Sequence, residues 1–414
     1  MKICLITPEF FPTWGGVGTY CIELVKAICD KVEVHVVTLL REGGNERYSI
    51  EEISNFFDGK INLHILTKAP VNDTFFYNSK LQIAVFRKLS KKIAVNRVDI
   101  IHSNFPAMPD LLYRLGWKKT LPSVTTVHTS IEMLRDGTKR SRKNIKDWEG
   151  SEKMTYLLTP FLYLCQKMYL SRSRNIIFVS DYVKNMVCSK YNLSSNINLI
   201  HMGVDTDEFS PKKSRELNDF FPRLSDVSPI VLFAGRLTAL KGIYVLAKAM
   251  REIVLRNSEV HFVFAGSGNI DLSRIMKSEA IPNNRYSVLG NIDRKRLPSL
   301  FASSSIFVLP SFIESCPLSV LEAMSSEALV IASNVGGVPE IIDNEFNGIL
   351  LPPGDHKRLA EKLLFFLENE RCKKMIGRNA RRKIKDSFTI EQMAGKTMRV
   401  YQDILDQNHE ALYN

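Results

Sequence analysis

Residues 233–250 read FAGRLTALKGIYVLAKAM, and this stretch sets the pattern for the whole chain. It begins with an apolar run that predicts a buried strand, and it ends with apolar positions at helical spacing. Arg236 and Lys241 lie in the loop between them, flanked by Gly235 and Gly242. A strand, a short loop and a helix in this order predict one unit of a parallel sheet covered by helices on both faces.

The same alternation recurs on both sides of a polar, proline-containing stretch at residues 206–228. A chain of 414 residues is too long for one ordinary core. We therefore expect an α/β protein with two doubly wound, Rossmann-like domains that face each other across a cleft. The expected limits are 1–205 and 206–388, with a helical tail at 389–414. Strands are predicted at residues 2–6, 32–38, 61–66, 99–102, 123–127, 175–179 and 197–200, then at 230–234, 261–265, 286–289, 306–309, 329–332 and 348–351.

The composition is that of a globular protein, with 45% hydrophobic and 24% charged residues. The seven cysteines form no CxxC pair, so we interpret them as small buried side chains in a reducing compartment. We expect no signal peptide and no membrane span, because no apolar run reaches about 20 residues. The longest, at residues 154–170, contains Pro160, Gln166 and Lys167. It predicts a core helix, with contact to a membrane surface as the alternative.

The net charge is +12, and most of the excess of Lys and Arg lies in residues 1–203. A basic half favours an acidic partner or an anionic membrane surface. Ordinary solvated surface is the alternative, because charge alone is a weak signal. Nucleic acid is not an expected partner, since no RNP, zinc-finger or KH-like signature is present and aromatic residues do not interleave with the basic runs.

Two cations follow the strand in the opening stretch. An arginine can bind phosphate through two N–H groups, while a lysine acts as a point charge. At the carboxyl end of a strand and beside a helix N-terminus, Arg236 and Lys241 are well placed for a diphosphate. The alternative is two surface cations, which the flanking glycines make less attractive.

Residues 310–324 read PSFIESCPLSVLEAM, with two acids around a proline that suits the first turn of a helix. Glu314 is then expected in the loop before the helix and Glu322 inside it. Carboxylates accept hydrogen bonds from vicinal hydroxyls, and the first amides, near Leu318 and Ser319, can donate to phosphate. The pattern favours a polyhydroxylated ligand that carries phosphate. An acid favoured by the helix dipole is the alternative, but it accounts for only one glutamate.

Near the N-terminus, residues 7–20 read TPEFFPTWGGVGTY. Gly15, Gly16 and Gly18 open a predicted helix, permit positive φ and leave room for a ligand at the backbone. A tight turn between strand and helix is the alternative.

Four further motifs are less specific. His128 ends the strand in SVTTVHTS and is either a catalytic or substrate-orienting imidazole or a structural group. Asp205 and Asp207 form a DxD, which we interpret as a turn in the linker rather than a metal site. AGSG at 265–268 lacks the third glycine of a dinucleotide fingerprint, and GGVPE at 336–340 is another glycine-led helix start.

Together and in this order, the motifs resemble those of the family 4 glycosyltransferases, which are retaining enzymes of the GT-B fold. The resemblance covers nearly the whole chain. Its motifs are GGVG at 15–18, His128, GRLTALKG at 235–242, ESCPLSVLE at 314–322 and GGVPEII at 336–342.

The resemblance implies that Arg236 and Lys241 bind the diphosphate of a nucleotide-sugar donor and replace a metal, so that no metal or other cofactor is expected. It further implies that Gly16 and the amides of Leu318 and Ser319 contact phosphate.

On the sugar side, the resemblance implies that Glu322 binds the nucleotide ribose and that Glu314 holds hydroxyls of the donor sugar. His128 would contact that sugar on the acceptor side. With Arg236 and Lys241, Glu314 and His128 form the expected catalytic group. The tail at 389–414 would return to the first domain.

We therefore expect a retaining hexosyltransferase of cell-surface glycan or glycolipid biosynthesis. Its acceptor would bind at residues 129–174, with Thr129 as a candidate contact, and would be a lipid-linked or anionic saccharide. That region includes a basic cluster of Lys139, Arg140, Arg142, Lys143 and Lys146. The expected location is cytoplasmic, peripheral at the inner membrane face. The alternatives are a nucleotide-sugar epimerase of the same fold, which needs no acceptor, and a non-catalytic protein that binds a sugar nucleotide.

Overall fold

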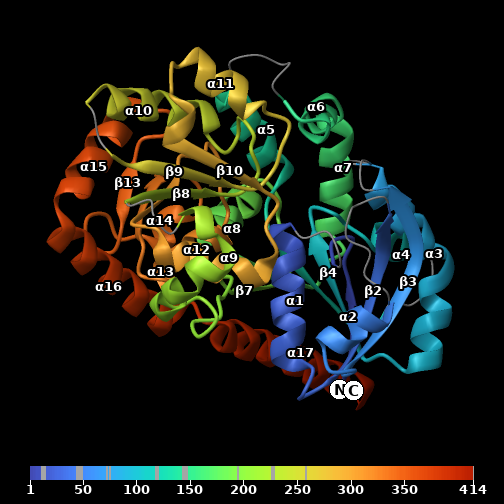
Figure 1. The fold of residues 1–414 in the computed structure, drawn as a ribbon. Helices are drawn as coiled ribbons and strands as arrows, with labels where there is room; N and C mark the ends of the chain where they lie inside the picture. The colour runs from blue at the N-terminus through green and yellow to red at the C-terminus, as the bar shows by residue number, and fades with distance from the viewer. Residues whose placement is uncertain are drawn as a thin grey trace. The chain divides into compact units, whose positions relative to one another are not determined.

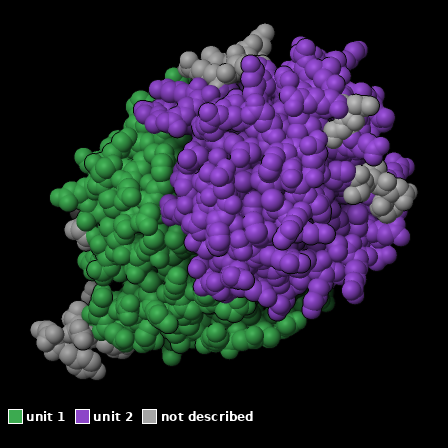
Figure 2. Space-filling model, turned by 90° about the vertical axis from the view of Figure 1, so that its left-hand side faces the viewer, with its two compact units in different colours: residues 1–133, 154–202, 390–414 green, residues 134–153, 203–389 purple. Residues whose placement is uncertain are grey.

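The structure is a computed structural model that describes residues 1–10, 15–42, 50–70, 73, 76–116, 121–141, 148–193, 195–224, 229–256 and 259–413. Three basic residues of the expected acceptor region, Arg142, Lys143 and Lys146, lie outside the described residues. The chain divides into two compact units, which Figure 2 colours separately. Unit 1 comprises Met1–Met133, Met154–Met202 and Ile390–Asn414, and unit 2 comprises Leu134–Lys153 and Gly203–Thr389.

In unit 1, seven of the described strands form a parallel sheet in the order β3-β2-β1-β4-β5-β6-β7. The strands are β1 (Lys2–Ile6), β2 (Glu33–Glu42), β3 (Ile61–Pro70), β4 (Ile100–Phe105), β5 (Ser123–Val127), β6 (Asn175–Phe178) and β7 (Asn196–Leu199). The strand order reverses between β1 and β4. In a doubly wound sheet, ligands bind beyond the carboxyl ends of the strands at such a reversal.

Helices lie on both faces of this sheet (Figure 1). They are α1 (Gly16–Ile28), α2 (Ile50–Phe56), α3 (Tyr77–Asn96), α4 (Leu111–Leu115), α7 (Thr159–Leu170), α8 (Asp181–Cys188) and α17 (Ile390–Tyr413). Two more helices, α5 (Ile131–Arg140) and α6 (Gly150–Leu157), each belong partly to unit 1 and partly to the segment 134–153 of unit 2. The apolar side of α3 packs on the sheet, where Leu81 and Val85 share a core with Val37 and Leu39. The C-terminal helix α17 packs against α1.

In unit 2, six of the described strands form a second parallel sheet in the order β10-β9-β8-β11-β12-β13. They are β8 (Ile230–Ala234), β9 (His261–Ala265), β10 (Tyr286–Gly290), β11 (Ile306–Leu309), β12 (Leu329–Ser333) and β13 (Ile349–Leu351). Here the order reverses between β8 and β11.

The helices of unit 2 also cover both faces of their sheet (Figure 1). They are α9 (Leu217–Phe220), α10 (Ile243–Leu255), α11 (Leu272–Ser278), α12 (Leu297–Ser303), α13 (Leu318–Ser325), α14 (Val338–Ile341), α15 (His356–Glu368) and α16 (Glu370–Ser387). α10 packs against α15, and α13 packs against α16.

The predicted α/β fold with two parallel sheets is confirmed, and each predicted strand overlaps an observed one. The reason is visible in β8, where all five residues are buried. A strand covered by helices on both faces must be apolar throughout, so its sequence stands out as a continuous run.

The prediction of one core helix at residues 154–170 is wrong. The segment forms two helices, α6 and α7, because Pro160 occupies the first turn of α7 and cannot continue α6. Its apolar side chains are partly in solvent: Leu157 is 71% exposed, Phe161 60% and Leu164 54%. Among the described residues, no helix is both long and apolar enough to cross a membrane.

Candidate functional site

The reversal point of the second sheet brings two of the predicted motifs together. β8 and β11 pair directly, with Val231 opposite Ile306. The loop after β8 carries Arg236 and Lys241, and the loop after β11 carries Glu314. Because parallel neighbours end at the same edge of the sheet, both loops leave that edge side by side.

A glycine allows these two loops to touch. Gly242 has φ +75°, and a Cβ there would lie 1.9 Å from the carbonyl oxygen of Pro310. The backbone N–H of Phe312 also donates to the carbonyl of Leu240 at 2.8 Å. No side chain larger than hydrogen fits at Gly242, so this glycine sets the distance between the loops.

The lysine and the acid of these loops form a direct ion pair. Lys241 Nζ lies 2.6 Å from Glu314 Oε1, and the buried Ser311 hydroxyl donates to the same oxygen at 2.7 Å. Glu314 is 8% exposed. A carboxylate this far from water needs a counter-charge and donors, and Lys241 and Ser311 supply both. Sequence reasoning missed Ser311, because a serine after a strand carries no signal of its own.

Arg236 has a different partner. Its Nη1 lies 2.8 Å from Glu149 Oε2, and its side chain is 60% exposed. Glu149 belongs to the segment 134–153, which unit 2 contains although it precedes the rest of that unit in the chain. The same segment approaches the Glu314 loop, since a Cβ on Gly137 would lie 2.8 Å from Ile313 Cβ. The two predicted diphosphate cations thus pair with separate carboxylates.

The second predicted acid lies in a helix that begins as expected. Pro317 is the N-cap of α13, so Glu314 stands before the helix and Glu322 within it. The first amides of a helix have no acceptor inside it, so those of Leu318 and Ser319 can bind an anion. The loop of the GGVPE motif adjoins this region, because the Gly337 N–H donates to the Glu314 carbonyl at 3.1 Å.

Glu322 is held by a residue that sequence reasoning passed over. Arg294 Nη1 donates to Glu322 Oε1 at 3.0 Å, and both side chains are nearly buried. The guanidinium of Arg294 also lies over the Phe209 ring, at 5.2 Å from its centroid. Arg294 belongs to a basic run, Arg294–Arg296. Because such runs are usually solvated, the sequence carried no indication that Arg294 pairs with a buried acid.

The two glycines of AGSG bring a third loop to the same edge. A Cβ on Gly266 would lie 2.1 Å from the Gly235 carbonyl oxygen, and one on Gly268 would lie 2.2 Å from that of Leu237. These glycines therefore allow the loop after β9 to pack against the Arg236 loop. That packing is their physical role, in line with the absence of a dinucleotide fingerprint.

In unit 1, His128 lies beyond the carboxyl end of β5 and is nearly buried. Burial, with a smaller contribution from His102, lowers its pKa to about 3. The Asn104 amide nitrogen points toward the Ile6 carbonyl, so its oxygen accepts the His128 Nε2–H at 2.9 Å. A neutral imidazole with Nε2 protonated presents Nδ1 as an acceptor.

A second histidine lies behind the first. Burial lowers the pKa of His102 to about 3 as well. Its ring nitrogens lie 2.7 Å from the Thr126 hydroxyl and 2.6 Å from the Tyr401 hydroxyl of α17. Tyr20 of α1 packs edge-on against His128, with centroids 4.8 Å apart. Residues far apart in the chain thus hold the imidazoles neutral and fixed.

The glycine motif near the N-terminus starts α1 at Gly16, with Gly15 as N-cap. Gly15 does not use the positive φ that glycine permits, since its φ is −105°. Space explains this glycine instead, because a Cβ on Gly15 would lie 2.3 Å from Glu9 Oε2. A Cβ on Gly16 would meet nothing within 4 Å, so the backbone there is open to a ligand.

Two smaller predictions concern Thr129 and the DxD motif. Thr129 follows His128, and within the described part of the chain its buried hydroxyl has no hydrogen-bond partner. Asp205 Oδ1 accepts the backbone N–H groups of Asp207 at 2.9 Å and Glu208 at 2.8 Å. The interpretation of the DxD as a turn is therefore confirmed.

Two family models match the chain. The model described as Glycosyltransferase Family 4 matches residues 14–208, and the one described as Glycosyl transferases group 1 matches residues 214–383. The chain belongs to glycosyltransferase family 4. An uncharacterized glycosyltransferase of Methanocaldococcus jannaschii is 28% identical over 97% of this chain and 98% of its own. The UDP-Gal:alpha-D-GlcNAc-diphosphoundecaprenol alpha-1,3-galactosyltransferase of Escherichia coli is 24% identical over 98% of both chains.

Solved structures of other glycosyltransferase-fold proteins share the architecture. Sucrose-phosphate synthase from Thermosynechococcus elongatus superposes with a TM-score of 0.78 at 20% identity, over 98% of this chain and 99% of its own. HepE from Anabaena, in complex with UDP-glucose, gives a TM-score of 0.70 at 17% identity, over 97% and 100%. At these identities the likeness concerns the fold, and it confirms the predicted GT-B class.

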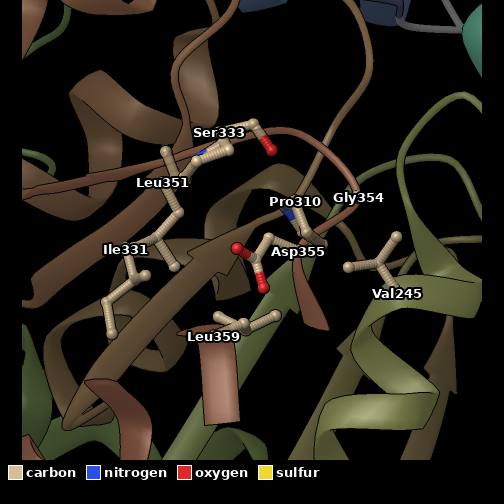
Figure 3. Close-up of a pocket in the computed structure, with 10 residues that line it drawn as sticks. Val245, Pro310, Ile331, Ser333, Leu351, Gly354, Asp355 and Leu359 are labelled. Atoms are coloured by element: carbon tan, nitrogen blue, oxygen red, sulfur yellow. The ribbon is translucent and has the colours of Figure 1, made fainter. Parts of the chain in front are cut away.

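A small space in this glycosyltransferase lies beside Pro310, at the start of the loop that carries Glu314. It has a volume of about 10 Å³ and is lined by Pro310, Ser333 and Leu351, among others (Figure 3). That is room for about one water molecule. Figure 3 shows the carboxylate of Asp355 close to Leu359, and Asp355 caps α15 by accepting the Arg358 N–H at 3.0 Å. We assign this space to helix packing.

Proposed function

We propose that this glycosyltransferase is a retaining, metal-independent enzyme that moves a hexosyl unit from a nucleotide diphosphate sugar to an acceptor hydroxyl. The Lys241–Glu314 pair at the reversal point of the second sheet carries the proposal. A cation for the diphosphate and an acid for the sugar are needed on either side of the bond that breaks. Here the two groups are 2.6 Å apart, beside the start of α13.

The leaving group sets the main demand of the reaction. As the bond from the anomeric carbon to the diphosphate oxygen breaks, negative charge grows on that oxygen and the sugar becomes cationic. Lys241, Arg236 and the first amides of α13 stabilise the growing charge from fixed positions. Lys241 then exchanges part of its contact with Glu314 for the diphosphate, and Glu314 accepts hydrogen bonds from the sugar hydroxyls.

His128 has an orienting role in this scheme. A pKa near 3 makes its imidazole a weak base at neutral pH, so it is poorly suited to remove the acceptor proton. Its neutral ring can instead accept a hydrogen bond from a donor-sugar hydroxyl. The acceptor oxygen attacks from the face that the diphosphate leaves, and its proton passes to the departing phosphate oxygen.

Two of the similar proteins suggest the first donor to test. The Escherichia coli relative is named for UDP-Gal, and the Anabaena structure contains UDP-glucose. We therefore propose a UDP-hexose as donor, held by Glu322 at the ribose. A calorimetric screen of UDP-, GDP- and ADP-sugars against the intact protein tests this, followed by assays with and without acceptors. Binding of none of these donors would contradict the proposal, and conversion of donor alone to an isomer would indicate an epimerase.

The acceptor is proposed to be a lipid-linked or anionic saccharide. A groove of about 410 Å³ in unit 1 is lined by Glu132, Tyr163, Leu164, Lys167, Lys190 and Tyr191. Aromatic rings suit the flat face of a sugar, and lysines suit an acidic group. The Escherichia coli relative, whose name contains diphosphoundecaprenol, supports a lipid-linked acceptor.

Peripheral membrane contact is proposed at the exposed apolar side chains of α6 and α7. Replacing Leu157 and Phe161 by serine should reduce co-sedimentation with anionic liposomes, because these side chains are 71% and 60% exposed and would enter the interface. Leu255→Ser is a matched control, since Leu255 is 73% exposed but lies in unit 2. Absence of liposome binding by the unmodified protein at low salt would contradict this part of the proposal.

A further inference from the structure

Arg294 and Glu322 form an ion pair between two segments of unit 2. Glu322 lies inside α13, whereas Arg294 follows β10. The distance from Nη1 to Oε1 is 3.0 Å, and the side chains are 12% and 7% exposed. A pair this far from solvent is screened little, so each charge depends on the other.

The arginine is itself held from its other side. Its guanidinium lies over Phe209, which is fully buried and packs edge-on against Phe301 with centroids 5.8 Å apart. The carbonyl of Phe209 accepts the Ser325 hydroxyl at 2.6 Å. Because Ser325 ends α13, the helix that carries Glu322 also fixes the ring beneath Arg294.

A glutamate needs such fixed neighbours if it is to bind a ligand selectively. Its side chain has three rotatable bonds, and burial without a counter-charge would favour its protonated form. A guanidinium at Oε1 supplies a counter-charge and sets the direction of the carboxylate. A carboxylate offers about four acceptor sites, so the bond from Arg294 occupies only part of that capacity.

We propose that Arg294 is a positioning residue that orients Glu322 to accept hydrogen bonds from the ribose diol of the donor nucleotide. Arg294 then sets the preference of the enzyme for ribonucleotides over deoxyribonucleotides without touching the nucleotide. This inference rests on the proposed function, in which Glu322 binds the ribose.

The test compares nucleotide pairs that differ only in the diol. Calorimetry measures Kd for UDP, GDP and ADP and for their 2′,3′-dideoxy counterparts. The unmodified protein should prefer the best ribonucleotide by about tenfold or more, as expected for hydrogen bonds to a charged group. Arg294→Met keeps the packing on Phe209 but removes the donors, and it should reduce the preference to less than about threefold. Arg294→Lys should restore part of it.

A neighbouring arginine provides the matched control. Arg296 lies in the same short helix, donates to the Phe220 carbonyl and lies over the Phe221 ring at 4.5 Å. Arg296→Met should lower the melting temperature about as much as Arg294→Met yet leave the ribose preference unchanged. If Arg294→Met does not fold, Arg294→Lys carries the test, because lysine does not reproduce the planar fork and should weaken the preference.

The outcomes distinguish the role of Arg294 from the proposed function of the protein. A full ribose preference in folded Arg294 variants overturns the role of Arg294 and leaves the proposed function standing. If the unmodified protein binds none of the nucleotides, the proposed function fails and this inference fails with it. Loss of the preference in Arg296→Met as well would indicate a general structural effect and would also overturn the assignment.

Discussion

The carboxyl edges of the two sheets both bury polar side chains, but those side chains differ in charge. In unit 1, the carboxyl edge presents His128 in a neutral network with Asn104, in front of His102. In unit 2, the corresponding edge presents ion pairs, Lys241–Glu314 and Arg294–Glu322. Both sets of side chains are largely buried, but only the second set is charged.

This difference shows how burial is tolerated in each place. Acids can stay ionised out of water when a cation and further donors meet them, as Lys241 and Ser311 meet Glu314. The ring nitrogens of the imidazoles meet hydroxyl and amide groups instead, and burial holds the rings neutral. The carboxyl edge of the sheet in unit 2 can therefore stabilise charge that develops during a reaction. The corresponding edge in unit 1 can orient uncharged groups. Four predictions test this contrast, beginning with the largest expected effect.

Lys241→Ala should lower turnover by roughly 10²–10³, the usual cost of removing one donor that stabilises a leaving oxygen. The fold should survive with a lower melting temperature, because the nearly buried Glu314 loses its counter-charge but keeps the Ser311 hydroxyl as a donor. Steady-state kinetics with the identified donor measures the loss, and exposed Lys277 on α11, changed to alanine, is the control. Near-normal turnover in Lys241→Ala would mean that the charged edge in unit 2 does not contribute to catalysis.

Changing the two acids should separate their roles. Glu314→Gln should lower turnover by roughly 10² without weakening nucleotide diphosphate binding, because this acid is expected to contact the sugar and its loss leaves Lys241 free for the diphosphate. Glu322→Gln should mainly weaken nucleotide binding. Calorimetry with the nucleotide diphosphate, beside turnover measurements, distinguishes the two. Equal effects of both variants on binding would contradict the division between sugar and ribose.

The neutral edge should make unit 1 sensitive to acid. The folded pKa of about 3 for His128 and His102 lies below the unfolded value near 6.5, so their stabilising contribution is complete above pH 6.5 and is lost as pH falls toward 3. At pH 5 each histidine should lower the free energy of unfolding by about 2 kcal/mol relative to pH 7.5. Urea unfolding at both pH values measures this.

A variant provides the control for that measurement. His102→Gln removes one titrating group, so the difference in unfolding free energy between pH 7.5 and pH 5 should shrink. An unchanged difference would mean that His102 is already protonated in the folded protein at pH 5. The rate of sugar transfer should show no titration step near pH 6.5 from His128. The pH profile of the rate should therefore keep the same shape in His128→Gln.

The smallest expected effect concerns Glu149. The Arg236 side chain of its ion pair is 60% exposed, so solvent weakens the pair and its contribution is modest. Glu149→Gln removes a negative charge that competes with the diphosphate, and it should tighten nucleotide diphosphate binding about two- to fivefold. Calorimetry at low and high salt checks this, since screening should reduce the difference. Weaker binding would instead indicate that Glu149 orients Arg236 for the ligand.

Several features of the fold and site could be predicted because they rest on local chemistry. Buried parallel strands are continuous apolar runs, and a proline after a loop marks a helix start, as at Pro317. The apolar run at 154–170 led to the wrong prediction of one core helix for a related reason. Apolar content alone does not tell a buried helix from two short helices with exposed faces.

Other features depend on contacts between distant segments. Arg294 and Arg296 are alike in sequence, yet one pairs with Glu322 and the other donates to a backbone carbonyl. Asn104 and Glu149 carry no motif, and their roles arise only from the groups they meet. No local pattern encodes such choices, because they depend on which loops the sheet brings to one edge.

The chain's residue pattern was enough to establish its α/β architecture, the order of its strands along the chain, the loops that carry Arg236, Lys241 and Glu314, and the helix that carries Glu322. These follow from hydrophobic periodicity and from turn chemistry, which act over a few residues. The tertiary structure alone decided which charges pair, which histidines stay neutral, and which glycines are needed for space. Those properties depend on burial and on atoms a few ångströms apart that lie up to hundreds of residues apart in the chain, as with His102 and Tyr401.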